Sequence, residues 1–151
     1  MSTLTIRPAT EADAGDITRV FTASRREYLP YAPLKHSDES IQQWLTQQIR
    51  SAIIMVAMQD TRIVGFYMLN EHAEGWWLDQ LYLLPDVTGQ GIGSTLLAHA
   101  MNRAGRPLML YTFADNHGAR RFYERHGFVA IRYGDGSDNE EGVPDVCYWL
   151  A

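Results

Sequence analysis

The sequence predicts a mixed α/β fold built as a single domain over residues 1–151. Strand-like and helix-like hydrophobic periods alternate from one end of the chain to the other. No repeat, low-complexity tract or linker interrupts this alternation. The hydrophobic fraction is 46%, which at 151 residues is enough to build one continuous core.

Turn residues and apolar spacing predict the elements of the first half. Pro8 ends a short opening strand, and Thr10 with Asp13 has the spacing of a capping box for a helix that runs to about Ser24. After a proline-containing loop, Ser37 is placed to cap a second helix. The apolar residues of this second helix recur at helical spacing and are expected to face inward: Ile41, Trp44, Leu45 and Ile49.

The middle of the chain is richer in strands. Segments 53–58 and 62–69 are separated by a short polar turn, which predicts a hairpin of adjacent antiparallel strands. The apolar run 76–84 has the pattern of a central strand buried on both faces, although it contains Asp79. A glycine-containing loop and a helix to about Ala104 follow. The remaining expected elements are a strand at 108–113, a helix at about 117–125, and strands at 128–133 and 146–150.

Charge and cysteine content exclude several classes of protein. The 13 basic and 18 acidic residues leave a net charge of -5, which argues against a general affinity for nucleic acid or anionic membranes. Cys147 has no second cysteine to pair with, so a reducing, cytoplasmic location is expected. No leader or membrane-spanning apolar run is recognisable. The five histidines show no ligand spacing with acids or Cys147, so no metal is expected.

The segment 86–94, between the apolar run and the next helix, carries glycines at alternate positions, Gly89, Gly91 and Gly93. Glycine permits positive φ and close approach of a ligand, and the N–H groups at a helix N-terminus favour phosphate. No lysine follows Gly93, which disfavours an ATP or GTP loop. A third dinucleotide-type glycine and an acidic ribose partner are also missing. The pattern predicts a diphosphate site, although a turn that binds nothing is the alternative.

Two segments resemble the GNAT superfamily of N-acetyltransferases. The family signature Arg/Gln-x-x-Gly-x-Gly/Ala matches at Gly91 and Gly93, whereas Thr88 stands where the family has arginine or glutamine. The segment 116–128 is similar to the family's Asn-x-x-Ala-x-x-Phe-Tyr-x-x-x-Gly-Phe pattern. The Leu-Tyr-Leu-x-Pro motif before the loop adds to the resemblance, which is strong over residues 76–133. The first 70 residues resemble the family only in the order of their helices and strands.

This resemblance implies a mixed, mostly antiparallel sheet of about six to seven strands, flanked by about four helices and splayed open after the fourth strand. It also implies acetyl-coenzyme A as acyl donor, with no metal, and makes a homodimer a reasonable expectation. The pantetheine arm would bond to strand main chain and the diphosphate to the glycine loop. The positions carried over as cofactor-binding are Leu81, Tyr82, Leu83, Thr88, Gly89, Gln90, Gly91, Ile92, Gly93, Ser94, Asn116, Ala119 and Tyr123.

The implied reaction is acetyl transfer to a primary amine by direct attack in a ternary complex, with Tyr123 as general acid. Asp79 is the leading candidate for the base, because an acid within an apolar strand requires a reason, and Glu71, Glu74 or a water relay are alternatives. The acceptor would be a small-molecule or peptide amine. The acidic segment 134–145 either attracts a cationic amine or is a solvated loop.

Two other functions compete with this one. A coenzyme A-binding regulatory module without catalysis would keep the cofactor residues. An acyltransferase could also use another acyl group or an oxygen acceptor.

Overall fold

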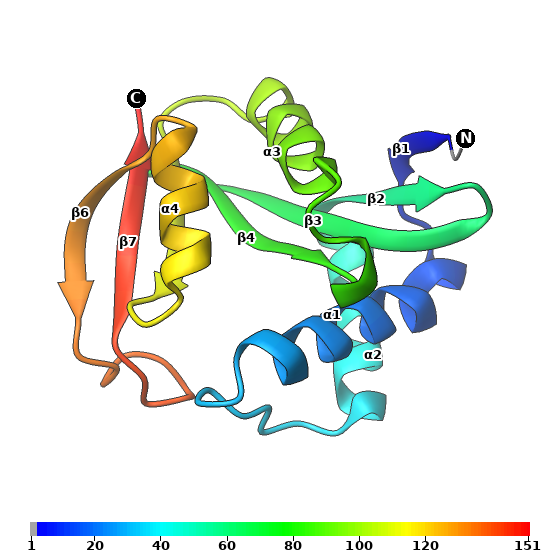
Figure 1. The fold of residues 1–151 in the computed structure, drawn as a ribbon, viewed down its shortest axis with the longest axis horizontal. Helices are drawn as coiled ribbons and strands as arrows, with labels where there is room; N and C mark the ends of the chain where they lie inside the picture. Colours follow the sequence, from blue (N-terminus) through cyan, green and yellow to red (C-terminus); the bar gives the residue numbers. More distant parts are fainter. Residues whose placement is uncertain (1–2) are drawn as a thin grey trace.

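The computed structural model describes residues 3–151, which form one seven-stranded sheet with helices on both faces (Figure 1). The predicted α/β class is confirmed. The elements are β1 (Leu4–Pro8), α1 (Ala14–Tyr28), α2 (Asp38–Ser51), β2 (Ile53–Gln59), β3 (Arg62–His72), β4 (Gly75–Leu83), α3 (Ile92–Arg103), β5 (Leu108–Phe113), α4 (His117–Arg125), β6 (Val129–Gly134) and β7 (Asp145–Leu150), with 3₁₀ turns at Glu11–Asp13 and Pro85–Val87.

The sheet has the strand order β1-β2-β3-β4-β5-β7-β6, and only the β4–β5 pair is parallel. Pairing between β4 and β5 is restricted to Trp76 with Leu108 and Trp77 with Met109. Beyond these pairs the two strands diverge, as Figure 1 shows. The predicted splay after the fourth strand is therefore confirmed, and it leaves the remaining edge of β4 without a strand neighbour on that side.

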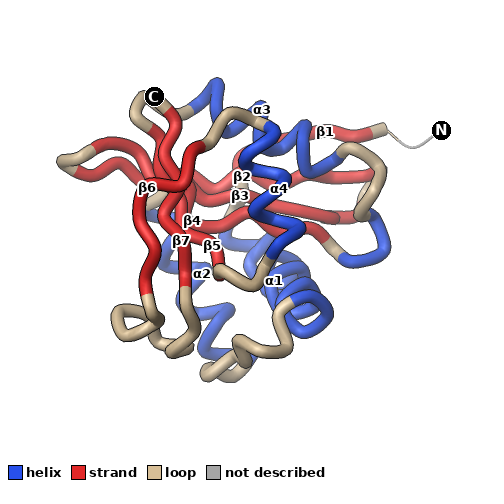
Figure 2. The backbone as a smooth tube through the Cα atoms, turned by 60° about the vertical axis from the view of Figure 1, so that its left-hand side comes forward, coloured by secondary structure: helices blue, strands red, loops and turns tan. Residues whose placement is uncertain are grey.

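The helices cover opposite faces of the sheet, α1 and α2 on one and α3 and α4 on the other (Figure 2). Neighbouring residues of β4 follow this division because side chains alternate along a strand. The Tyr82 ring lies 5.2 Å from that of Phe21 in α1, between ring centroids, whereas Leu83 packs beside Gly93 in α3. The strand that carries the splay is thus held by helices from both sides.

Three expectations about burial or length were wrong. Helix α1 continues to Tyr28, one turn past Ser24, because nothing in the intervening residues opposes a helix before Pro30. Trp44 is 36% exposed and contacts Phe21 from the edge of the core, so it does not face fully inward. Residues 76–83 of the apolar run are mostly half-buried and not fully buried, because β5 leaves the edge of β4 after Trp77. No helix among residues 3–151 has the length and apolar character to cross a bilayer.

Replacement of Asp13 by asparagine is expected to lower the free energy of unfolding at neutral pH but not at acidic pH. The Asp13 carboxylate accepts hydrogen bonds from the Arg7 guanidinium at 2.8 and 3.0 Å and from the Thr10 N–H at 2.8 Å. The Arg7 hydrogen bond is the main cause that lowers the pKa of Asp13 from 3.8 to about 2. Because the folded-state pKa is depressed, the stabilisation is complete above pH 4 and is lost as the pH falls from about 4 to 2.

After allowance for screening at the half-exposed guanidinium, Asp13→Asn should cost about 1 kcal/mol at pH 7. Urea unfolding at pH 7 and near pH 2 measures this difference, which should disappear at the lower pH. Asp16→Asn, which removes an exposed pair with Arg19, is the control and should leave the stability at pH 7 nearly unchanged. An Asp13→Asn defect that persisted at low pH would contradict the assignment.

Candidate active site

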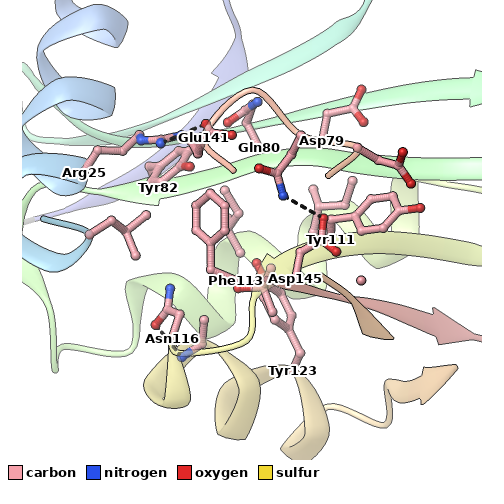
Figure 3. Close-up of a pocket in the computed structure, with 18 of the residues that line it drawn as sticks. Arg25, Asp79, Gln80, Tyr82, Tyr111, Phe113, Asn116, Tyr123, Glu141 and Asp145 are labelled. Atoms are coloured by element: carbon pink, nitrogen blue, oxygen red, sulfur yellow. Dashed lines mark hydrogen bonds and ion pairs between the residues drawn. The ribbon is translucent and has the colours of Figure 1, made fainter. Parts of the chain in front are cut away.

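A cavity of about 520 Å³ lies where β4 and β5 part. Strand β4 contributes residues 78–82, β5 contributes 111–113, α4 contributes Ala119 and Tyr123, and Asn116 is the N-cap of α4. Figure 3 shows Tyr123 and Asn116 rising from α4 on one side, with Asp79 and Tyr82 on the other. The cavity therefore joins main chain from the free edge of β4 to side chains from an element some 40 residues later in the chain.

Asp79 occupies a β-bulge. In the β3–β4 register Gln80 pairs with Met68 and Leu78 with Leu69, which leaves Asp79 without a partner residue. A bulge of this kind redirects a side chain and is common beside active sites. Here it turns the carboxylate of an otherwise apolar strand into the cavity, where Asn70 Nδ2 donates a hydrogen bond to it.

The surroundings of Asp79 favour its protonated form more than water does. Its side chain is accessible through the cavity, yet the cavity walls remove much of its hydration. This desolvation raises the pKa of Asp79 above its ordinary value, against the opposing effects of the Asn70 hydrogen bond and the charge of His72. A carboxylate with a raised pKa is a stronger base than one with the ordinary pKa.

Tyr123 projects from α4 into an aromatic setting. Its ring lies edge-on to those of Phe122 and Phe128, at 5.2 and 5.7 Å between centroids, and the residue is 9% exposed. Burial raises the pKa of Tyr123 far above its ordinary value, so the phenol stays protonated at neutral pH. Among residues 3–151 no hydrogen bond uses its hydroxyl, which leaves that group free to donate to a ligand in the cavity.

Asn116 has two roles at the start of α4. Its Oδ1 accepts a hydrogen bond of 3.2 Å from the Ala119 N–H and so caps the helix. The same side chain lines the cavity, where its Nδ2 group can still donate. The cap and the cavity contact are compatible, as the sequence predicted.

The glycine loop lies between β4 and α3 and outside the cavity lining. Gly89 and Gly91 both have φ of 81°, and open space surrounds the position that a side chain would take at either residue. Helix α3 begins at Ile92, whose side chain is buried, so only its main chain can reach a ligand. The Thr88 hydroxyl donates to Pro85 O at 3.0 Å and lies 3.3 Å from the Tyr28 hydroxyl. Positive φ, open space and unpaired helix N–H groups fit a diphosphate here.

Some sequence-predicted residues are not brought to the cavity. Leu83 faces α3, so only its main chain is relevant to the open edge. Glu71 and Glu74 lie at the far end of the β3–β4 hairpin, outside the cavity lining. Glu74 instead accepts from Trp77 Nε1 at 3.2 Å, and hydrogen bonds from its own N–H and from Trp77 lower its pKa. Of the three acids considered as a base, Asp79 is the one that lines the cavity.

Sequence reasoning missed several lining residues. Arg25, Tyr111 and Arg132 all line the cavity, and the acidic segment 134–145 contributes Asp138, Glu141 and Asp145 to it. A signal for Arg25 existed, since it follows Ile17 and Phe21 at intervals of four residues and so lies on the apolar stripe of α1. The residues of the acidic segment could not be placed, because a loop has no period that indicates where its side chains point.

Comparison with known proteins agrees with this geometry. The sequence model of the Acetyltransferase (GNAT) family matches residues 17–128, which include the glycine loop and α4. The chain belongs to the GNAT acetyltransferase family. Among residues 3–151 no group of three or more His, Cys, Asp or Glu is arranged to hold a metal ion.

The similar proteins differ in length and in named activity. An uncharacterized N-acetyltransferase of Archaeoglobus fulgidus is 31% identical over 130 residues, which cover 78% of this chain and 88% of the relative. Mycothiol acetyltransferase of Streptomyces coelicolor is 38% identical over 81 residues, but these span 49% of this chain and only 26% of that protein. The crystal structure of the PaiA N-acetyltransferase from Thermoplasma acidophilum in complex with coenzyme A has a TM-score of 0.76 at 23% identity, with 97% and 98% of the chains covered. This last similarity shows the shared fold.

Proposed function

We propose that this GNAT protein transfers an acetyl group from acetyl-coenzyme A to a primary amine of a small molecule or peptide, by direct attack in a ternary complex. The observation that carries the proposal is the cavity at the splay, which is lined by the Tyr123 hydroxyl, the Asp79 carboxylate and the free edge of β4. An acid, a base and main-chain donors are the groups that acyl transfer to an amine requires.

The residues fit acetyl-coenzyme A as donor substrate. The N-terminus of α3 and the glycine loop would bind the diphosphate, and the unpaired main chain of residues 81–83 would bond the pantetheine arm as an added strand does. The coenzyme A complex of PaiA, a protein of the same fold, supports this choice of ligand. Thr88 supplies no positive charge, so the backbone N–H groups must carry the phosphate interaction.

Each catalytic step has a group in the cavity. A protonated amine must lose a proton before it attacks, and Asp79 is the base that we assign to this step. The amine then forms its bond to the carbonyl carbon, and a main-chain N–H of β4 stabilises the resulting oxyanion. As the carbon–sulfur bond breaks, Tyr123 donates a proton to the departing thiolate, and the excess proton on the acylated nitrogen then returns to the Tyr123 phenolate, which leaves the neutral amide and the free thiol. Asn116 helps to position the donor beside the opening.

Thiol release across a chemically diverse amine panel tests the proposal. Acetyl-coenzyme A should be consumed with a stoichiometric N-acetylated product, which mass spectrometry identifies. Cofactor binding without thiol release from any amine would favour a regulatory coenzyme A-binding module instead. An O-acetyl product would favour the acyltransferase alternative with an oxygen acceptor.

Asp79→Asn is expected to lower kcat/KM by about 10- to 100-fold and to remove the acidic limb of its pH profile. The wild-type rate should fall as the pH drops through the raised pKa of Asp79, because the protonated carboxyl cannot accept a proton. Glu74→Gln, which neutralises a competing acid outside the cavity, should keep the wild-type profile. A profile of Asp79→Asn with the same acidic limb would exclude the base role.

A further inference from the structure

The two halves of the sheet, which part after Trp77, are joined again at the far side of the cavity. The segment that follows α1 meets the β6–β7 connection there, as Figure 1 shows. Arg25 Nη2 lies 3.1 Å from Glu141 Oε2, although 116 residues separate them. The carboxylate of the neighbouring residue Glu140 lies 3.0 Å from His36 Nε2 and accepts a hydrogen bond from it when this nitrogen carries the proton. We call the Arg25–Glu141 pair the clasp.

The clasp is buried and supported on several sides. The side chains of Arg25 and Glu141 are 8% and 12% exposed, and Arg25 Nη2 also donates to Ala32 O at 3.1 Å. The guanidinium lies 5.5 Å from the Phe21 ring centre and 5.7 Å from that of Phe113 in β5. Removal of one partner would leave an uncompensated buried charge, which is strongly unfavourable. The clasp therefore holds α1, β5 and the β6–β7 connection together as one rim.

This rim forms part of the cavity wall, since both Arg25 and Glu141 line the cavity. Pairing between β4 and β5 stops at Trp77, and Arg25 and Glu141 lie on the side of the cavity away from Tyr111 (Figure 3). A volume of about 520 Å³, part of which the acetyl-pantetheine end must use, suits a molecule of metabolite size. A polypeptide laid across the site in extended form would need a groove open at both ends.

The charge of the residues that line the cavity is a second criterion for the acceptor. Glu141 is neutralised by Arg25, whereas Asp79, Asp138 and Asp145 form no salt bridge within residues 3–151. Arg132 is the other basic lining residue, and its guanidinium donates to the Tyr111 hydroxyl and lies over that ring. Three unneutralised carboxylates against one guanidinium give the lining a net negative charge, which favours a cationic ligand.

We propose that the acceptor is a small, free amine with a further positive charge, and that the Arg25–Glu141 clasp excludes amines that belong to a polypeptide chain. This inference rests on the proposed acetyl transfer and narrows its acceptor. In it Arg25 and Glu141 determine specificity by shaping the cavity wall, and they take no part in proton transfer.

Two matched acceptor comparisons test the proposal. Nα-acetylated lysine amide, hereafter lysine amide, and the same lysine at the centre of an unstructured peptide each present one primary amine with the same charge and differ only in the length of the attached chain. A short diamine and an amino sulfonate of equal length differ in the sign of the second charge. Wild-type kcat/KM should favour lysine amide over the peptide, and the diamine over the sulfonate, by at least about tenfold each.

Glu141→Gln should weaken the contact between Arg25 and residue 141. The ratio of kcat/KM for lysine amide to kcat/KM for the peptide should fall several-fold, whereas KM for acetyl-coenzyme A should stay unchanged. Asp38→Asn is the control, because it removes the exposed pair of the adjacent residue Arg26 and should keep the wild-type ratio. If Glu141→Gln fails to fold, Arg25→Lys keeps the charge but removes the guanidinium that lies near the Phe21 and Phe113 rings, and it should shift the ratio in the same direction.

A wild-type enzyme that acetylates the peptide as well as lysine amide, or a folded clasp variant with an unchanged ratio, would overturn this inference and leave acetyl transfer intact. Preference for the amino sulfonate would overturn the charge criterion. Absence of transfer to every amine, despite calorimetric binding of acetyl-coenzyme A, would instead overturn the proposed function and this inference with it.

Discussion

Tyr123→Phe is expected to lower kcat for amine acetylation by about 100-fold or more, while the Kd for acetyl-coenzyme A stays within about twofold. The phenylalanine ring keeps the edge-on contacts with Phe122 and Phe128, so the shape of the cavity should survive. What the variant loses is a hydroxyl that has no hydrogen-bond partner among residues 3–151 and whose pKa burial raises. The thiolate must then leave without a proton donor.

Steady-state thiol release and titration calorimetry separate the two effects. Tyr67→Phe is a matched control, because its hydroxyl is also buried but bonds His99 Nδ1 at 2.6 Å, outside the cavity. That variant should lose stability and keep kcat, since it loses one buried hydrogen bond. Unchanged turnover in Tyr123→Phe would remove this tyrosine from the mechanism.

Gly91→Val is expected to weaken acetyl-coenzyme A binding by at least about 30-fold. At φ of 81° a β-branched residue is strained by about 1–3 kcal/mol, and the loop would relax away from the conformation that presents its N–H groups. The new side chain would also occupy open space at the N-terminus of α3, where we place the diphosphate. Both effects should weaken the binding of acetyl-coenzyme A.

Gly142→Val provides the matching control for strain. Its φ is 68°, its side-chain position is likewise open, and it lies in the β6–β7 connection, away from α3. Thermal unfolding of the free proteins should show similar losses for both variants, whereas calorimetry should show weakened cofactor affinity for Gly91→Val alone. Normal affinity in Gly91→Val would mean that the diphosphate binds elsewhere.

Local patterns predicted most of the fold. Strand and helix periods, capping residues and glycines act within a few residues, so the order of elements and most of their bounds could be derived before any contact was known. The splay was implied by a family resemblance, and the restricted β4–β5 pairing confirms it. Trp44 was misplaced, because apolar spacing indicates which face a residue lies on and not how far the neighbouring layer extends.

The residues of the candidate site also differ in whether a local pattern predicts them. Asn116, Ala119 and Tyr123 could be predicted together because one helix carries them at fixed spacing. Asp79 was recognised as an acid in an apolar strand, but the reason that it faces the cavity is a bulge whose position depends on the register with β3. A register is a property of two strands, so one segment of sequence does not contain it.

The sequence by itself indicated the family, the glycine loop between β4 and α3 and the segment that carries Tyr123, because each consists of neighbouring residues whose types and spacing define the structure. Tertiary structure alone decided which acids reach the cavity and how the cavity is bounded. Arg25 meets Glu141 because the arrangement of the whole sheet places α1 beside the β6–β7 connection. Contacts at such sequence separation depend on the packing of every element between them, and no local pattern encodes them.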